Sequence, residues 1–393
     1  MFGSPDLHLA VAALLFVGAC LGHLGLAVYS HNWWYGGHLS KRLGDVMHFA
    51  HALLVLAFPV VLWLACGPDV TSLFRAGSGP PWRLALAGYV ALCWLVGFGV
   101  LPALTLYRLL RPCPAALLQT KSEVIDVAAR LGRRPEGDNR QRWMTRLPGN
   151  QAFQCEFVER TLALPRLPAA WDGLTVLHLS DIHLNGTPDR DYFRVVMDRC
   201  AAWRPDLVAV TGDVADSVHH RRWIVPVLGR LRWNVAALAI LGNHDHWYEP
   251  PFIRRRLRRL GMHVLVNSWE QLEVRGEPLV VIGHEGPWLR PAPDLGDCPA
   301  GPFRLCLSHT PDNITWARRA GVDLMLSGHV HGGQVRFPVV GSMLVPSRYG
   351  RRYDCGVFAE GPTLLHVSRG LSGEHPLRYG CRPEVTRLTL RNT

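Results

Sequence analysis

Three long apolar runs occupy the first 110 residues, at residues 7–29, 46–66 and 84–107. None of them contains a charged side chain, and the whole stretch holds only eight. A helix needs about 20 apolar residues to cross a bilayer, and each run meets that length. A buried globular helix is the alternative for any one run, but three in succession favour membrane spans. We therefore predict a membrane domain over residues 1–110 with three transmembrane helices.

The distribution of basic residues predicts the orientation of these spans. Lys41 and Arg42 follow the first run, Arg75 and Arg83 follow the second, and six further basic residues lie between positions 108 and 134. Because basic residues concentrate in cytoplasmic loops, we expect the first loop and the C-terminal region to face the cytoplasm. The chain would then be a multi-pass protein of the cell (inner) membrane.

Two features of composition bear on the partners of the chain. His23, His48 and His51 lie in the apolar region. They could bind a haem or a metal within the membrane, or they could be polar groups packed between helices. The formal net charge is +11 at pH 7, but no RNA-binding aromatic motif, zinc finger or helix-turn-helix pattern accompanies it, so we expect no nucleic-acid partner. Membrane lipids or a phosphorylated substrate explain the excess better.

The remainder of the chain divides at about residue 153. Residues 111–152 are basic and contain four prolines, which predicts a juxtamembrane linker with one short helix at residues 121–131. Residues 153–393 alternate strands and helices and predict a mixed α/β domain of two packed sheets with helices outside. Helices are expected at residues 192–203, 218–231 and 251–260. Strands are expected at residues 174–180, 206–211, 235–241, 264–267, 279–283, 303–308, 322–327, 363–367 and 385–390.

Polar side chains follow five of these predicted strands where each strand ends. They are of the types that bind first-row divalent metals, and the carboxyl ends of strands in α/β sheets gather at one edge. Seven such residues are too many for one tetrahedral site but suit two metals that share a carboxylate, and Asp213 is the natural bridge. Two metals about 3.5–4 Å apart can hold a hydroxide between them and clamp a phosphoryl oxygen. The seven are Asp181, His183, Asp213, Asn243, His309, His329 and His331.

The same segments resemble the calcineurin-like metallophosphoesterases over about residues 158–390. The motifs that carry the resemblance are Asp181-Ile182-His183, Gly212-Asp213, Gly242-Asn243-His244-Asp245, His309 and Gly328-His329-Val330-His331. The extensions Ser308-His309-Thr310-Pro311-Asp312 and His331-Gly332-Gly333-Gln334 are similar to the bacterial, membrane-anchored phosphodiesterase branch. The resemblance implies an αββα sandwich of two sheets, here preceded by the three transmembrane helices.

The resemblance also implies roles for single residues. One metal would be held by Asp181, His183, Asp213 and His331, and the other by Asp213, Asn243, His309 and His329. His244 would meet the phosphate and its leaving group as a catalytic residue. Asp245 would orient His244, although a role at a helix N-terminus is an equal alternative.

Other polar residues receive plainer interpretations. Asp216 could support the metal loop, but a surface carboxylate is the simpler interpretation. The five arginines within residues 254–259 could bind a substrate diphosphate or lipid headgroups, or they could form a solvated face. Five histidines outside the motifs are expected to be ordinary polar residues: His178, His246, His284, His366 and His375.

These observations predict an enzyme, a metal-dependent phosphoric ester hydrolase. A bridging hydroxide would cleave a phosphodiester or pyrophosphate bond, on a lipid-linked or nucleotide-linked substrate. UDP-2,3-diacylglucosamine pyrophosphatase is one candidate activity from the resemblance. A phosphomonoesterase or protein phosphatase, and a non-catalytic metal-binding membrane scaffold, are the alternatives. The ligand set accepts manganese, iron, zinc, cobalt or nickel, with manganese favoured.

Overall fold

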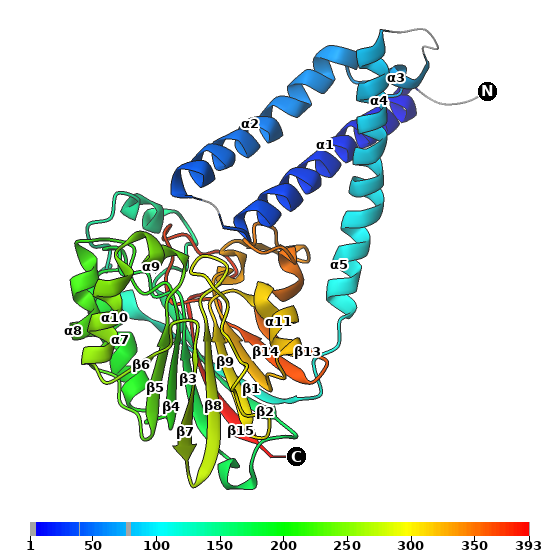
Figure 1. Cartoon of the computed structure of the whole chain (residues 1–393). Coiled ribbons are helices and arrows are strands. Elements are labelled where there is room, and N and C mark those ends of the chain that lie inside the picture. Colours follow the sequence, from blue (N-terminus) through cyan, green and yellow to red (C-terminus); the bar gives the residue numbers. More distant parts are fainter. Residues whose placement is uncertain (1–4, 39, 76–79, 393) are drawn as a thin grey trace. The chain divides into compact units, whose positions relative to one another are not determined.

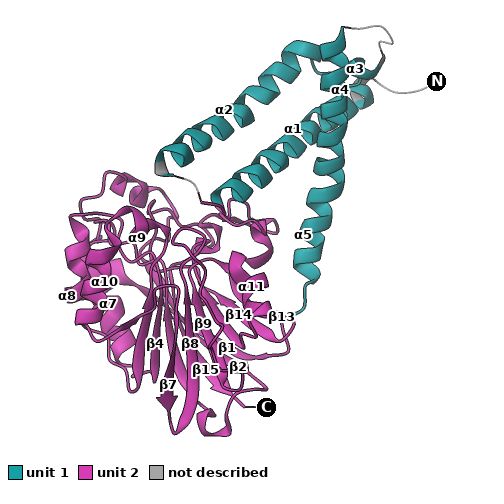
Figure 2. Cartoon of the chain, in the orientation of Figure 1, with its two compact units in different colours: residues 1–35, 39–112 teal, residues 36–38, 113–393 magenta. Residues whose placement is uncertain are grey.

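The computed structural model describes residues 5–38, 40–75 and 80–392 (Figure 1). The chain forms two compact units (Figure 2). The first contains residues 1–35 and 39–112, and the second contains residues 36–38 and 113–393. The predicted membrane orientation rests in part on Lys41 and Arg75, and the side chains of these two residues lie outside the described part of the chain.

The first unit is helical. It contains α1 (Pro5–Tyr35), α2 (Lys41–Cys66), the short α3 (Ser72–Arg75), and α4 (Pro81–Trp94), which continues through a π-helical stretch (Leu95–Val100) into α5 (Leu101–Leu110). Three helices in the described residues are long and apolar enough to cross a membrane, at Leu7–Tyr35, Arg42–Cys66 and Pro81–Leu110. The three predicted apolar helices are therefore confirmed.

Small and polar residues join these helices to one another. A Cβ on Gly22 of α1 would lie 1.8 Å from Cys93 O of α4, so only glycine allows this close packing. His23 contacts Tyr89 Oη at 2.6 Å and Leu54 O at 3.1 Å, through its two ring nitrogens. These contacts favour the packing interpretation of His23 over a ligand role.

Two large mixed sheets form the centre of the second unit. In the described residues one sheet has seven strands in the order β1-β2-β15-β3-β4-β5-β6, and the other has six in the order β13-β14-β10-β9-β8-β7. Neighbours β3, β4 and β5 are parallel, as are β8, β9, β10 and β14. The first sheet consists of β1 (Leu117–Asp126), β2 (Gln154–Ala163), β3 (Thr175–Leu179), β4 (Leu207–Thr211), β5 (Ala236–Ile240), β6 (His263–Val264) and β15 (Glu384–Arg391). The second consists of β7 (Trp269–Val274), β8 (Glu277–His284), β9 (Phe303–Ser308), β10 (Leu324–Ser327), β13 (Gly356–Glu360) and β14 (Thr363–Val367).

Three hydrophobic clusters separate the second unit into four layers, namely helices, the first sheet, the second sheet and a helix. In β4, Val208 and Val210 pack with the helices on one side, whereas Leu207 and Ala209 pack against the second sheet. This alternation is the period of two expected for a strand buried on both faces. Helices α7 (Arg190–Ala201), α8 (Ile224–Leu228) and α10 (Pro250–Arg259) lie along one outer side, and α11 (Ile314–Arg319) lies along the other (Figure 1). The predicted αββα sandwich is therefore confirmed.

The segment expected to be a linker differs from its prediction. Cys113 and the residues after it belong to the second unit. The helix predicted at residues 121–131 is wrong in its first half, because Lys121 to Asp126 belong to β1, which pairs antiparallel with β2. Only α6 (Val127–Leu131) is helical there, capped by Asp126 Oδ1, which accepts the Ala129 N–H at 2.9 Å.

Candidate metal centre

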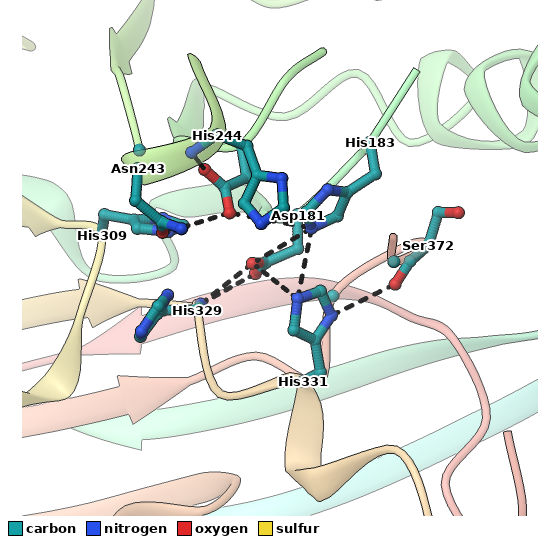
Figure 3. Close-up of polar contacts among 12 residues, drawn as sticks. Asp181, His183, Asn243, His244, His309, His329, His331 and Ser372 are labelled. Atoms are coloured by element: carbon teal, nitrogen blue, oxygen red, sulfur yellow. Dashed lines mark hydrogen bonds and ion pairs between the residues drawn. The ribbon is translucent and has the colours of Figure 1, made fainter. Parts of the chain in front are cut away.

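Loops at the carboxyl ends of five strands bring the predicted residues together. Those after β3, β4 and β5 carry Asp181, His183, Asp213, Asn243 and His244, and those after β9 and β10 carry His309, His329 and His331. The side chains point toward a common region (Figure 3). Each of the seven predicted ligands lies in this group, and all but His331 are less than a tenth exposed.

One subgroup gathers around Asp181. His331 Nε2 lies 3.5 Å from Asp181 Oδ1, and His183 Nε2 lies 3.8 Å from the same oxygen. The two imidazoles are 3.2 Å apart at Nε2, and His183 Nε2 is 3.7 Å from Asp213 Oδ2. Two atoms that each lie about 2.1 Å from one ion are at most about 4.2 Å apart. All four separations meet that limit.

A second subgroup gathers on the other side of Asp213. His309 Nε2 lies 3.1 Å from Asp213 Oδ2 and 3.0 Å from Asn243 Oδ1. The ligand atoms of Asp213, His309 and His329 all lie within 4.8 Å of one another. Asp213 Oδ2 therefore faces both subgroups, which is the geometry that a bridging carboxylate requires.

Hydrogen bonds at Nδ1 orient three of the imidazole rings, so that Nε2 points into the centre. Nδ1 of His183 bonds Asp216 Oδ2 at 2.6 Å. Nδ1 of His309 bonds Thr211 O at 2.7 Å, and Nδ1 of His331 bonds Ser372 O at 3.2 Å. Such bonds fix the tautomer and leave Nε2 as the free ligand atom.

Two buried atoms of the centre have no hydrogen-bond partner among the described residues, and they are the two ring nitrogens of His329. Polar atoms buried without a partner are costly, so a group that is not part of the chain is expected to satisfy them. Carboxylate oxygens and imidazole nitrogens together fit first-row divalent metals, and the residues present therefore fit two such ions.

Electrostatics divides three of the ligand histidines into two kinds. Burial lowers the pKa of His329 and of His331 to about 3, so both rings are neutral at pH 7. Burial also opposes protonation of His309, but Asp213 outweighs it and raises the pKa of His309 to about 9. The proton on His309 offsets the charge of Asp213, a task that a divalent cation would take over.

Asp216 orients His244, and the predicted role of Asp245 needs correction. His244 Nδ1 lies 3.2 Å from Asp216 Oδ1, so the buried Asp216 serves both His183 and His244 and is not a surface carboxylate. Asp245 instead accepts the backbone N–H groups of Val214, Ala215 and Gly242. It holds the β4 and β5 loops together, which is closer to the alternative of a helix N-terminal role.

Burial and charge set the protonation of His244. Burial disfavours the imidazolium, but the carboxylates of Asp216 and Asp213 outweigh it and raise the pKa of His244 above its ordinary value. The side chain is 13% exposed, more than the ligand histidines His183 and His309 at 0%. His244 is thus a partly accessible imidazole beside the ligands.

Five ligand residues have a backbone that is rare for side chains other than glycine. The φ angles of Asp181, His183, Asp213, His329 and His331 lie between 46° and 69°. Left-handed residues are uncommon outside glycine, although Asp and His are enriched among them. Strained backbone of this kind clusters at functional sites.

The loop after β8 supports the centre, and sequence reasoning missed it. The Trp288 ring centroid lies 4.6 Å from that of His329. Glu285 is fully buried, accepts the Leu241 N–H at 2.8 Å, and pairs with Arg254 at 2.5 Å. Arg254 is therefore bound to the loop after β8 through Glu285 and is not part of a free basic face. The only sequence signal for Trp288 and Glu285 is that their loop follows a buried strand, β8.

His284, at the end of β8, is a buried neutral imidazole. Its Nδ1 accepts the Gly286 N–H at 3.1 Å and lies 3.2 Å from Asn313 Nδ2. Burial lowers the pKa of His284 to about 4. It is a structural polar residue, as expected.

Comparison with known proteins agrees with this geometry. Residues 174–333 match the family model of the calcineurin-like phosphoesterases. The chain is 30% identical over 247 residues to the uncharacterized metallophosphoesterase YkuE of Bacillus subtilis, covering 61% of this chain and 86% of that protein. It is 30% identical over 226 residues to the phosphodiesterase YaeI of Escherichia coli, covering 55% and 81%.

A vertebrate relative carries the word transmembrane in its name. The chain is 27% identical over 276 residues to the transmembrane protein with metallophosphoesterase domain of Danio rerio, covering 62% of this chain and 59% of that protein. Together with the three apolar helices, this likeness indicates membrane association. The matches confirm the family expected from the motifs: the chain belongs to the calcineurin-like metallophosphoesterase family and is a metal-dependent phosphoester hydrolase.

Proposed function

We propose that the protein is a membrane-anchored phosphoesterase that hydrolyses a phosphodiester or pyrophosphate bond of a lipid-linked or nucleotide-linked substrate. The observation that carries the proposal is the convergence of seven potential ligands and His244 around the shared carboxylate of Asp213. UDP-2,3-diacylglucosamine is one candidate substrate, because it combines a lipid, a nucleotide and a pyrophosphate.

Two divalent ions would fit the two subgroups. Asp181, His183, Asp213 and His331 would hold one, and Asp213, Asn243, His309 and His329 would hold the other. Three of these seven residues offer oxygen, which favours manganese among the first-row metals. When bound, such ions polarise a phosphoryl group and lower the pKa of water.

His244 would act on the leaving group. The carboxylates beside it outweigh burial and raise its pKa, which favours the protonated ring, and Asp216 holds Nδ1 so that Nε2 remains for the substrate. An imidazolium there can stabilise charge on a phosphoryl oxygen and donate its proton to the departing oxygen.

The preference for a diester or pyrophosphate rests on likeness to a named enzyme. The Escherichia coli relative is a phosphodiesterase, and the chain covers 81% of it. A phosphomonoesterase remains the alternative activity and is one outcome of the experiment below.

An exposed apolar hairpin supports a lipid-linked substrate. Strands β11 (Arg336–Phe337) and β12 (Gly341–Ser342) follow the metal loop within a few residues of His331. Phe337, Val339 and Leu344 in and beside this hairpin are 51%, 67% and 49% exposed. Exposed apolar side chains next to a site are suited to contact with acyl chains.

The basic residues that flank the apolar helices bear on where the catalytic domain lies. With the basic loop residues on the inner side, we place the catalytic domain in the cytoplasm at the inner membrane. A topology reporter fused after Thr393 tests this, and periplasmic activity would contradict it.

The function is tested with the full-length chain in detergent after removal of metal and addition of manganese. Three substrates are offered in parallel: p-nitrophenyl phosphate, bis(p-nitrophenyl) phosphate, and UDP-2,3-diacylglucosamine. We expect metal-dependent cleavage of the diester and the lipid pyrophosphate, and little of the monoester. Asp213→Asn should abolish turnover, whereas Asp198→Asn should not, because Asp198 is a half-exposed partner of Arg230.

A variant of the exposed hairpin tests separately whether the substrate is lipid-linked. Replacing Phe337 and Val339 with serine should raise KM for the lipid pyrophosphate and leave the soluble diester unchanged. Equal effects on both substrates would contradict a lipid-contacting role. Absence of metal-dependent turnover on every ester, with Asp213→Asn equal to wild type, would overturn the proposed function itself.

A further inference from the structure

A second group of potential metal ligands lies outside the centre described above. Asp138, His219 and His220 offer ligand atoms that all lie within 4.8 Å of one another. They come from two segments about 80 residues apart in the sequence. None of them belongs to the two subgroups around Asp213.

His220 has the surroundings of a ligand held in place. It is 7% exposed, and its Nδ1 lies 3.1 Å from Ser217 Oγ, which fixes that side of the ring. Its buried Nε2 faces Asp138 Oδ1 at 2.9 Å. A metal-binding histidine is usually held through its other ring nitrogen, as Nδ1 is held here by Ser217.

The backbone at Gly186 makes room for this approach. A Cβ there would lie 2.1 Å from Asp138 Oδ1 and 2.9 Å from His220 Nε2, and φ is +100°. The Asp138 N–H donates to Gly186 O at 3.2 Å, which fixes the loop that carries the carboxylate. Three segments of the fold therefore meet at this point.

We propose that Asp138, His219 and His220 form a third metal site that binds a first-row divalent cation, zinc above all. Two imidazoles and one carboxylate give three ligands, and water would complete a tetrahedron. Two ligand atoms of a tetrahedral zinc lie about 3.3 Å apart, so the pair now at 2.9 Å would separate only slightly. Arg222 contacts His219 Nε2, but its side chain is exposed and can turn into solvent.

The site would join two parts of the catalytic unit. Asp138 lies in the segment between α6 and β2, and His220 ends the loop that begins at Asp213 and carries Asp216. A bound ion would hold that loop against the segment leading from the membrane helices. It would therefore stabilise the loop without touching the substrate.

Metal content tests the proposal independently of turnover. Full-length protein in detergent is stripped of metal, loaded with zinc, freed of excess by gel filtration, and measured by mass spectrometry. We expect His220→Gln and Asp138→Asn each to hold one zinc fewer per chain than wild type. Asp138 is a 63% exposed side chain, so its substitution leaves folding intact even if His220→Gln does not.

A surface pair of the same chemistry provides the control. His263 Nδ1 lies 2.6 Å from Glu270 Oε1, both side chains are more than a third exposed, and no third ligand accompanies them among the described residues. His263→Gln should keep the wild-type zinc content. Cobalt(II) loading gives a second readout, since the visible absorption of the tetrahedral ion should fall in both site variants.

Equal zinc content in wild type, Asp138→Asn and His220→Gln would overturn the third site. A loss of zinc in His263→Gln as large as in His220→Gln would overturn it too. A chain that binds this ion but hydrolyses no phosphate ester would contradict only the function proposed above.

Discussion

Replacing Asp216 with asparagine should slow hydrolysis and shift its pH dependence, because this single carboxylate serves two histidines. Its two oxygens face Nδ1 of His183 at 2.6 Å and Nδ1 of His244 at 3.2 Å. A carboxylate accepts from both rings. A carboxamide has one acceptor and one donor, so one of the two N–H groups would meet another donor.

The size of the effect follows from one lost charge-assisted bond. Hydrogen bonds to charged groups contribute about 1.5–3 kcal/mol. A loss of about 2 kcal/mol corresponds to roughly 30-fold in kcat/KM. The same loss, applied to the imidazolium of His244, lowers the pKa of this ring.

The assay is kcat/KM for the soluble diester between pH 5 and pH 9 at saturating manganese. Because His244 must carry a proton to act, its lower pKa should move the alkaline limb of the profile to lower pH. Saturating metal separates this effect from a weaker metal site at His183, for which about 10–100-fold is usual. Asp198→Asn is the matched control. A kcat/KM within twofold of wild type, with an unmoved alkaline limb, would refute the reasoning.

Three further predictions concern stability and metal binding. Trp171→Ala should lower the free energy of unfolding by about 3–5 kcal/mol, because Trp171 is fully buried and its indole N–H donates to Val274 O. The control is Trp143→Ala, at an exposed position, which should change the free energy of unfolding by less than about 0.5 kcal/mol in the same denaturant titration. Burial lowers the pKa of His284 to about 4, so its contribution to the free energy of unfolding is complete above pH 6.5, and up to about 3 kcal/mol of stability is lost as the pH falls to 4. In denaturant titrations over this pH range, His284→Gln should therefore show a weaker dependence of stability on pH. Binding of manganese at pH 7 should release protons, because the pKa of His309 is raised to about 9 and that of His183 is raised as well. The heat measured by calorimetry should therefore depend on the ionisation enthalpy of the buffer, and a heat that is equal in all buffers would contradict this prediction.

The sequence predicted the centre because strands and ligands are both local signals. Each ligand follows directly on a short apolar strand, and parallel strands carry their carboxyl ends to one edge. The bonds around the ligands are not local. Asp245 adjoins His244 in the chain, yet its carboxylate turns to backbone N–H groups of the β4 loop. Asp216 reaches His244 instead, which only the packing of two loops determines.

The segment before the catalytic motifs shows the same limit. Strand β1 is mostly exposed, so it lacks the apolar alternation that identifies a half-buried strand. Its conformation comes from pairing with β2, whose partner residues lie about 30–45 positions along the chain. Backbone pairing with the distant strand β2 therefore determines the conformation of this segment, against the local sequence preference that predicted a helix.

The left-handed backbone of five ligand residues places folding and function under opposed selection. A residue other than glycine in that conformation costs about 1 kcal/mol or more, and glycine relieves most of it. At His183, His329 and His331, a library screened only for thermal stability without metal should therefore enrich glycine. A screen for hydrolysis should retain histidine. The positions where the two screens disagree would mark the metal centre of this chain by experiment, with no alignment needed.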